Sequence, residues 1–132
     1  MADELGFGVV GLGMGKHHCR SVSEAKGARL VAVCDTDEER LNAMMEQHGC
    51  KGYTSYEEML QDDEIDVVNV ATPSGMHAQF GIQAADAKKH LIVEKPADIT
   101  TDRVDQLIAA VRDNGVKVGC IFQARLNPLN RK

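Results

Sequence analysis

Two hydrophobic patterns alternate along the chain: short continuous apolar runs, and longer stretches with apolar residues at helical spacing. A continuous apolar run rich in β-branched residues is typical of a strand buried on both faces of a parallel sheet. Such runs predict strands at 5–10, 28–34, 65–71, 90–94 and 116–122. A shorter segment at 51–54 is a connecting link or a small strand.

The stretches between these runs carry apolar residues three or four positions apart, which predicts helices that each bury one side. We expect helices at 14–25, 37–48, 55–60, 76–89 and 100–114. Gly49 and Gly115 stand where C-cap glycines are expected. Thr36 is a candidate N-cap of the second helix, and Ser55 with Glu58 matches a capping box.

This alternation of strand and helix predicts an α/β fold, a doubly wound parallel sheet (Rossmann fold) with helices on both faces. Right-handed crossovers leave 3-2-1-4-5 as the natural strand order, in which we count 65–71 as the third strand. We expect one domain over 1–122, followed by a polar, irregular segment at 123–132.

The composition is that of an ordinary soluble globular protein, with 43% hydrophobic and 27% charged residues in 132. A net charge of −5 without a basic run argues against nucleic acid as a partner. No apolar run approaches the roughly 20 residues that span a bilayer, and the N-terminal sequence lacks the features of a signal peptide. The four widely spaced cysteines favour free thiols in a reducing compartment, so we expect a cytoplasmic protein.

A glycine-rich turn follows the first strand, and it departs from G-x-G-x-x-G because its third glycine comes one position early. Glycine allows positive φ and a close approach of ligand to backbone, and a helix N-terminus attracts anions. The turn therefore predicts a binding site for the pyrophosphate of a dinucleotide. The alternative is an ordinary strand-to-helix turn. The predicted cofactor-binding residues of this turn are Gly11, Leu12, Gly13, Met14 and Gly15.

Polar residues follow the other strands at the sheet edge where ligands of such folds bind. Asp35 comes about 20 positions after the glycine turn, where an acid that binds the adenosine ribose is expected. The next residue is Thr36 rather than arginine, so the sequence favours NAD over NADP. The alternative for Asp35 is that it only helps to cap the next helix.

Lys95 follows the fourth strand, between Glu94 and Pro96. A lysine ammonium is suited to orienting a hydroxyl or polarising a carbonyl, although a surface lysine in a loop is the alternative. The histidines include no set of three ligands at zinc spacing, so we expect no metal.

Four motifs together resemble the N-terminal domain of the Gfo/Idh/MocA family of NAD(P)-dependent oxidoreductases: VVGLGMGKHH, VAVCDTDEER, VATPSGMHAQF and LIVEKPADIT. The resemblance implies that Lys95 lies beside the nicotinamide and the reacting carbon, as the catalytic lysine. It also implies that Thr72 and Pro73 line the cofactor groove, with His77 and Glu94 close by.

The resemblance further implies that 123–132 begins a crossing into a second, substrate-binding domain, which supplies most of the substrate pocket and a homo-oligomer interface. Within the tail, Arg125 and Asn127 resemble substrate-side residues. The implied reaction is hydride transfer between nicotinamide and a sugar-type secondary alcohol, and the P-S-G-x-H and Q-x-R-x-N variants are similar to nucleotide-sugar dehydrogenases of the family. We expect this chain alone to be inactive. The alternative is a stand-alone NAD-binding sensor or regulatory module without catalysis.

Overall fold

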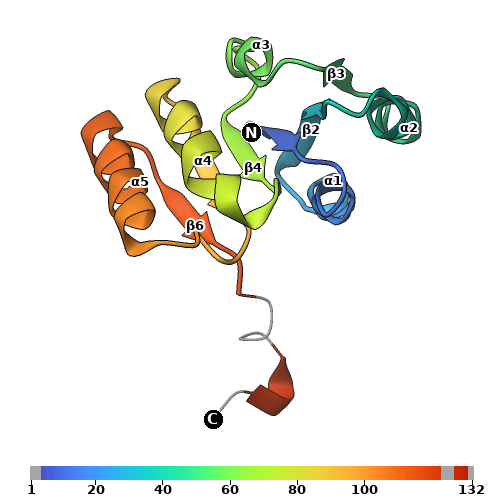
Figure 1. Ribbon diagram of the computed structural model, residues 1–132. Coiled ribbons are helices and arrows are strands. Elements are labelled where there is room, and N and C mark those ends of the chain that lie inside the picture. Colours follow the sequence, from blue (N-terminus) through green and yellow to red (C-terminus); the bar gives the residue numbers. More distant parts are fainter. Residues whose placement is uncertain (1–3, 123–126, 131–132) are drawn as a thin grey trace.

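The computed structural model describes residues 4–122 and 127–130, and its core is a six-stranded parallel sheet with helices on both faces (Figure 1). The strands run in the order β3-β2-β1-β4-β5-β6. Their bounds are β1 Leu5–Val10, β2 Ala28–Cys34, β3 Lys51–Tyr53, β4 Val67–Val70, β5 His90–Val93 and β6 Val118–Cys120. The predicted doubly wound α/β fold is confirmed.

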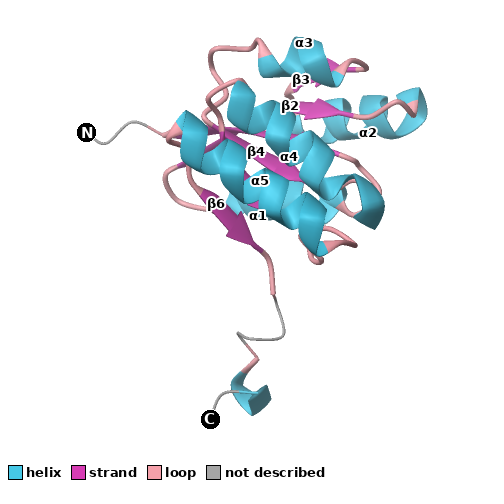
Figure 2. Ribbon diagram, turned by 60° about the vertical axis from the view of Figure 1, so that its left-hand side comes forward, coloured by secondary structure: helices cyan, strands magenta, loops and turns pink. Residues whose placement is uncertain are grey.

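The helices lie between the strands, as predicted. Their bounds are α1 Gly15–Glu24, α2 Glu38–His48, α3 Tyr56–Leu60, α4 His77–Asp86 and α5 Thr101–Asn114, with short 3-10 turns η1 at Ser74–Met76 and η3 at Pro128–Asn130. Helices α4 and α5 cover one face of the sheet, seen in front of β4 in Figure 2. Helices α1 and α2 lie against the other face (Figure 1).

The predicted strand order 3-2-1-4-5 is found, with β6 added at the edge, but the third place belongs to the small strand β3. The segment 65–71, which was counted as third, is β4 and pairs with β1 from Phe7↔Val67 to Val10↔Val70. Strand β3 is only three residues long and lacks an apolar run, because it lies at the sheet edge and pairs with β2 through its backbone.

Strands β4 and β6 are shorter than predicted, since the strand pairing covers only Val67–Val70 in β4 and Val118–Cys120 in β6. The C-cap predictions are confirmed, since Gly49 and Gly115 both take left-handed conformations (φ 63° and 65°). The N-cap prediction for Thr36 is wrong. Asp37 caps α2 instead, and its carboxylate accepts hydrogen bonds from the N–H groups of Glu39 and Arg40, since a carboxylate suits a helix N-terminus better than a hydroxyl.

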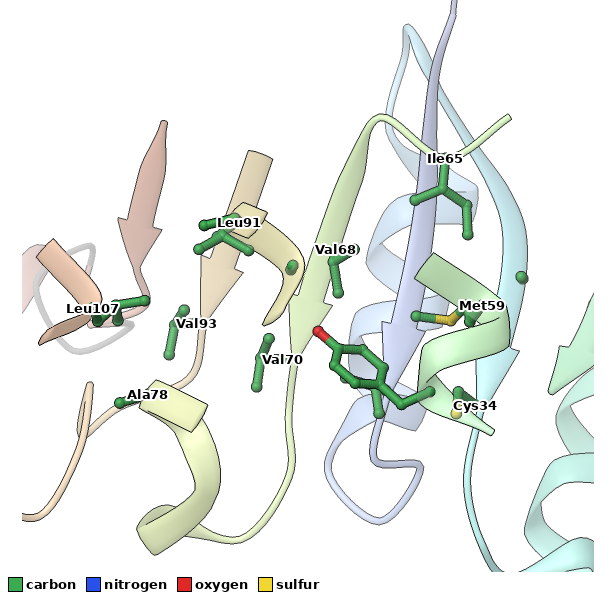
Figure 3. Packing of buried hydrophobic residues seen from close by; sticks show 14 of the residues in the cluster. Cys34, Met59, Ile65, Val68, Val70, Ala78, Leu91, Val93 and Leu107 are labelled. Atoms are coloured by element: carbon green, nitrogen blue, oxygen red, sulfur yellow. The ribbon is translucent and has the colours of Figure 1, made fainter. Parts of the chain in front are cut away.

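The core has two parts because neighbouring strand residues point to opposite faces. Val10 points to the face under α3, α4 and α5, whereas Val9 points to the face under α1 and α2. Figure 3 shows the larger part, in which valines of β4 and β5 lie beneath the three helices. The buried residues labelled there are Cys34, Met59, Ile65, Val68, Val70, Ala78, Leu91, Val93 and Leu107. Apolar packing on both faces fixes the strands, and hence the positions of the loops at their carboxyl ends.

Core packing predicts a large difference between two isoleucines. Ile65 is 2% exposed in the larger core, whereas Ile99 is 64% exposed in the loop before α5. We expect Ile65→Ala to lower the free energy of unfolding by about 2–5 kcal/mol, because it removes buried methylene groups and leaves a cavity. The matched control Ile99→Ala should change it by less than about 0.5 kcal/mol. Urea unfolding followed by circular dichroism measures both, and equal effects would contradict this account of the core.

Candidate functional site

A cleft of about 890 Å³ lies at the carboxyl ends of the strands. It is lined by the turn after β1, the end of β2, the start of α3, the segment from Ala71 to η1, helix α4, and Glu94 with Lys95. The structure thus brings together the polar groups that the sequence placed at separate strand ends. The predicted residues that line the cleft are Gly11, Gly13, Met14, Asp35, Thr36, Thr72, Pro73, His77, Glu94 and Lys95.

The glycine turn is built so that only glycine fits at Gly11. Its φ is +89°, and an added Cβ would stand 2.7 Å from backbone atoms of Ala71. Gly15 opens α1 and packs against β1, where an added Cβ would stand 2.9 Å from a methyl carbon of Val9. The early third glycine therefore still provides close helix–strand packing, although the turn is one residue short.

The turn presents its backbone to the cleft. Gly13 and Met14 are exposed there, and no side chain caps the N-terminus of α1. The N–H groups of Gly15 and His17 donate to the carbonyls of Gly11 and Met14, so within the described residues those of Gly13, Met14 and Lys16 are left for an anion. Leu12 and Gly15 do not line the cleft. The Leu12 side chain is buried against the core under α1 and α2, so only its backbone faces the turn.

Asp35 ties the glycine turn to the end of β2. Its Oδ2 accepts a hydrogen bond from the Leu12 N–H (2.8 Å), and its Oδ1 accepts one from the Asp37 N–H (2.8 Å). The carboxylate is half-buried and lines the cleft. Each carboxylate oxygen can accept a further hydrogen bond, so the group remains able to accept from ligand hydroxyls while it orders the turn.

Arg40 is a cleft residue that the sequence reasoning missed. It comes from the first turn of α2, and a guanidinium nitrogen lies 3.4 Å from where a Cβ of Gly13 would stand. Its Nε also lies 3.5 Å from Oδ2 of Asp37. The sequence feature that could have identified Arg40 as a cleft residue is its position five residues after Asp35. At that spacing, the first turn of the helix brings the side chain back over the end of the strand. A cation thus stands beside the glycine turn.

Several apolar and amide side chains of the cleft were also missed. Tyr56 of α3 and Phe80 of α4 form one wall, with ring centroids 4.6 Å apart. The Tyr56 hydroxyl donates a hydrogen bond to the Phe80 carbonyl (2.7 Å), which fixes the two helices to each other. These residues belong to the apolar faces of their helices, so the sequence pattern alone could not separate them from ordinary core residues.

A buried polar network holds Glu94 beside Lys95. Oε1 of Glu94 lies 2.8 Å from Nε2 of His18 on α1, and Oε2 accepts a hydrogen bond from the Lys95 N–H (3.2 Å). Nδ1 of His18 lies 3.1 Å from the Asn69 amide nitrogen of β4. An amide nitrogen can only donate, so Nδ1 accepts and Nε2–H donates to the carboxylate. Helix α1 and strand β4 therefore orient the segment that carries Lys95.

Lys95 itself is exposed at the cleft, and its Nζ has no hydrogen bond or ion pair with any residue in 4–122 or 127–130. Its ammonium group can therefore reach a ligand without breaking a structural contact. The side chain of His77 is 1% exposed, and both of its ring nitrogens lie 2.6 Å from backbone carbonyl oxygens.

The two tail residues predicted on the substrate side have different outcomes. Arg125 lies outside the described residues. Asn127 is described, is exposed and does not line the cleft, and its Oδ1 accepts a hydrogen bond from the Leu129 N–H (3.0 Å). Within the described ranges, no three His, Cys, Asp or Glu residues lie together as a metal site, and no helix is long and apolar enough to cross a membrane.

Cys34 lines the cleft floor at the end of β2, but its thiol is a poor nucleophile. Burial, together with the negative charges of Asp35 and Glu57, raises the pKa of Cys34 to about 12. The thiolate is the reactive form of cysteine, so this thiol contributes packing rather than covalent chemistry.

Comparison with known proteins gives a family match over residues 5–122, to the model GFO_IDH_MocA, described as an oxidoreductase family with an NAD-binding Rossmann fold. The chain is 33% identical to the myo-inositol 2-dehydrogenase of Thermotoga maritima over 92% of its own length and 37% of that protein. It is 31% identical to an NADP-dependent D-xylose 1-dehydrogenase of Haloferax volcanii over 96% of its length and 39% of that protein.

Among solved structures, the chain resembles the WlbA dehydrogenase of Bordetella pertussis, crystallised with NADH and UDP-GlcNAcA. The TM-score is 0.91 at 31% identity, over 96% of this chain and 39% of that one. The chain thus spans about two fifths of the length of these relatives.

The buried position of Cys34 predicts slow alkylation in the native state. We expect iodoacetamide at pH 8 to modify the half-buried Cys50 and Cys120 before Cys34 and Cys19, since burial also raises the pKa of Cys19 to about 12. In urea all four thiols should react at similar rates. Peptide mass spectrometry over time measures each site, and native Cys34 labelling as fast as Cys120 would contradict the assignment of Cys34 as an unreactive thiol.

Proposed function

The chain belongs to the Gfo/Idh/MocA oxidoreductase family as an NAD-binding Rossmann domain, and from this premise we propose that its cleft binds NAD in preference to NADP. We further propose that, in a longer protein, it provides the cofactor side of hydride transfer involving a sugar-type secondary alcohol. The single observation that carries the proposal is the position of Asp35, whose half-buried carboxylate lines the cleft while one oxygen holds the Leu12 N–H of the glycine turn and the other the Asp37 N–H before α2.

The described residues fit a dinucleotide. The cleft volume lies within the usual range for ligand sites. Gly13, Met14 and the uncapped start of α1 would hold the pyrophosphate, with Arg40 beside them, and Asp35 would accept hydrogen bonds from the adenosine ribose. The hydroxyl oxygen of Thr72 is buried and has no hydrogen-bond partner within the described part of the chain. A bound ligand atom would supply that partner.

The preference for NAD follows from charge. A carboxylate accepts from two ribose hydroxyls but repels a 2′-phosphate, so Asp35 favours NAD. Arg40 is a cation near this site that opposes the preference, and the Haloferax relative is named for NADP, whereas WlbA was crystallised with NADH. Asp37 lies beside the Arg40 guanidinium and partly neutralises its charge. We therefore propose that the Asp35 carboxylate, rather than Arg40, decides the preference and favours NAD.

Lys95 is the proposed catalytic residue. When bound, the nicotinamide accepts or returns a hydride; the chain must place the alcohol carbon against it and exclude water. An unpaired ammonium at the cleft edge suits the task of orienting a substrate hydroxyl and stabilising negative charge on its oxygen. Thr72 and Pro73 line the cleft at the end of the neighbouring strand β4, and the buried His77 acts through these loops rather than through the cofactor.

The substrate class rests on the relatives. Two are named for the oxidation of an inositol and a xylose, and the WlbA crystal holds a sugar nucleotide. These names support a sugar-type substrate, including nucleotide sugars, for the longer protein. Three further points remain predictions: the longer protein forms a homo-oligomer, it is cytoplasmic, and Asn127 contacts the substrate.

Cofactor titration tests the preference. We expect NAD to bind more tightly than NADP, and Asp35→Ala to weaken NAD binding by about 1–3 kcal/mol while NADP binding changes less. The selectivity ratio is the readout, because a damaged turn would weaken both cofactors alike. Asp63→Ala is the matched control, since Asp63 is exposed in the turn before β4, does not line the cleft and should leave the ratio unchanged. Calorimetry showing NADP bound as tightly as NAD by the unaltered chain would refute the preference.

Kinetics of the longer protein tests Lys95. We expect Lys95→Met to lower kcat by about 10²–10⁴ while NAD affinity stays within about twofold, because the ammonium acts on the reacting groups. Lys26→Met, in the exposed turn between α1 and β2, is the control and should keep full activity. A panel of polyols, sugars and sugar nucleotides identifies the substrate. The 132-residue chain assayed alone should show no turnover; activity near that of the longer protein would contradict this account of an incomplete site.

A further inference from the structure

His77, the first residue of α4, has an unusual hydrogen-bond arrangement. Its Nδ1 lies 2.6 Å from the carbonyl oxygen of Pro96, and its Nε2 lies 2.6 Å from the carbonyl oxygen of Thr72. The side chain is buried, so water does not compete for either nitrogen. Both partners are backbone carbonyls from loops that are far apart in the sequence.

A carbonyl oxygen can accept a hydrogen bond but cannot donate one. Each His77 nitrogen must therefore carry a proton to bond its partner. A neutral imidazole has only one N–H, and its other nitrogen would direct a lone pair at the facing carbonyl oxygen. Two short contacts to acceptors thus fit the doubly protonated, positively charged ring, whose charge-assisted bonds are shorter and stronger than neutral ones.

The surroundings supply a balancing negative charge. Asp98, in the loop before α5, is buried, and its Oδ2 accepts a hydrogen bond from the N–H of Ala78, the residue next to His77. Burial raises the pKa of the Asp98 carboxyl, but the N–H groups of Ala78 and Ile99 and the charges of Arg103 and His77 lower it more, so its pKa lies below the usual range. Asp98 is therefore an anion near the ring.

The other charged groups on the surrounding elements are Arg103 of α5, 3.7 Å from Asp98, and Glu94 and Lys95 at the end of β5. Glu94 is occupied by His18 and by the Lys95 N–H, and η1 carries no ionisable side chain. Asp98 is thus the carboxylate that remains to balance the His77 ring.

The two carbonyls belong to loops at the carboxyl ends of the neighbouring strands β4 and β5. Thr72 leads into Pro73 after β4, and Pro96 follows Lys95 after β5; Thr72, Pro73 and Lys95 line the cleft. A single ring bonded to both carbonyls fixes how far Lys95 stands from the Thr72–Pro73 segment.

We propose that His77, as an imidazolium, is a positioning residue that ties the Lys95–Pro96 segment to the Thr72–Pro73 segment and so sets where Lys95 stands in the NAD site. This inference rests on the proposed function for its consequence in cofactor binding. Its claim about the charge of the ring rests on the hydrogen-bond geometry alone.

Nuclear magnetic resonance tests the charge directly. In the chain labelled with ¹⁵N in histidine rings, we expect His77 to show two protonated nitrogens at pH 7, and its signal is assigned by its loss in His77→Gln. One unprotonated His77 nitrogen at this pH would overturn the proposal. His48 serves as an internal comparison, because its Nδ1 contacts a hydroxyl of Ser23 that can donate or accept and so demands no particular charge.

NAD affinity measured from pH 6 to 9 tests the positioning. We expect the unaltered chain to bind NAD roughly five- to tenfold more weakly once His77 loses a proton, with the midpoint that the His77 resonance shows. This shared midpoint separates His77 from His18, which also lies near the cleft. His77→Gln should bind more weakly throughout, with no step at that midpoint, because one amide nitrogen cannot span both carbonyls. The control His48→Gln should retain the step.

NAD affinity that stays constant while the His77 resonance titrates would overturn the positioning role. This measurement needs only the unaltered chain, so it decides the question even where His77→Gln fails to fold. A chain that binds no NAD at any pH would instead refute the proposed function, and the resonance of His77 would still decide whether the ring carries the charge.

Discussion

The close approach of the β4–η1 segment to Gly11 is the constraint on which the site depends. Backbone atoms of Ala71 and Thr72 occupy the space that any Cβ at position 11 would need, and the φ of +89° is one that L-residues avoid. Because Gly11 directly follows β1 and Ala71 directly follows β4, this contact brings the two central strands of the sheet together at their carboxyl ends. The cleft opens directly above it, where the chain passes from one half of the sheet to the other.

Polar groups then replace apolar packing above this contact, and each joins segments that the strands alone would not hold. Asp35 joins the turn to β2, the His18–Glu94 pair joins α1 to the end of β5, and His77 joins the two loops that carry Thr72 and Pro96. Buried polar groups are costly unless they are bonded, so these pairs specify one arrangement of the loops more sharply than apolar contacts could.

The sequence predicted what local chemistry determines. Continuous apolar runs located the long strands, and left-handed glycines ended α2 and α5 where expected. It missed what depends on encounters between distant segments. Strand β3 has no apolar run because it is an edge strand, and Arg40 enters the cleft only because α2 folds back over β2. The N-cap of α2 is Asp37 rather than the predicted Thr36, because local sequence locates a helix end only to within one or two residues.

The same reasoning shows why the cleft is only one side of a catalytic site. Oxidation of an alcohol releases a proton as well as a hydride, so some group must accept that proton. At the Lys95 end, Glu94 already accepts from His18 and from the Lys95 N–H, and both nitrogens of His77 are bonded to carbonyls. Glu94 could take a substrate proton only by giving up a bond that positions Lys95, and the doubly protonated His77 ring has no lone pair to accept one. Lys95 itself, as an ammonium, has no lone pair to offer. Under the proposed function, the described residues hold the cofactor and orient a hydroxyl, and none of these three groups at the Lys95 end is free to accept the proton.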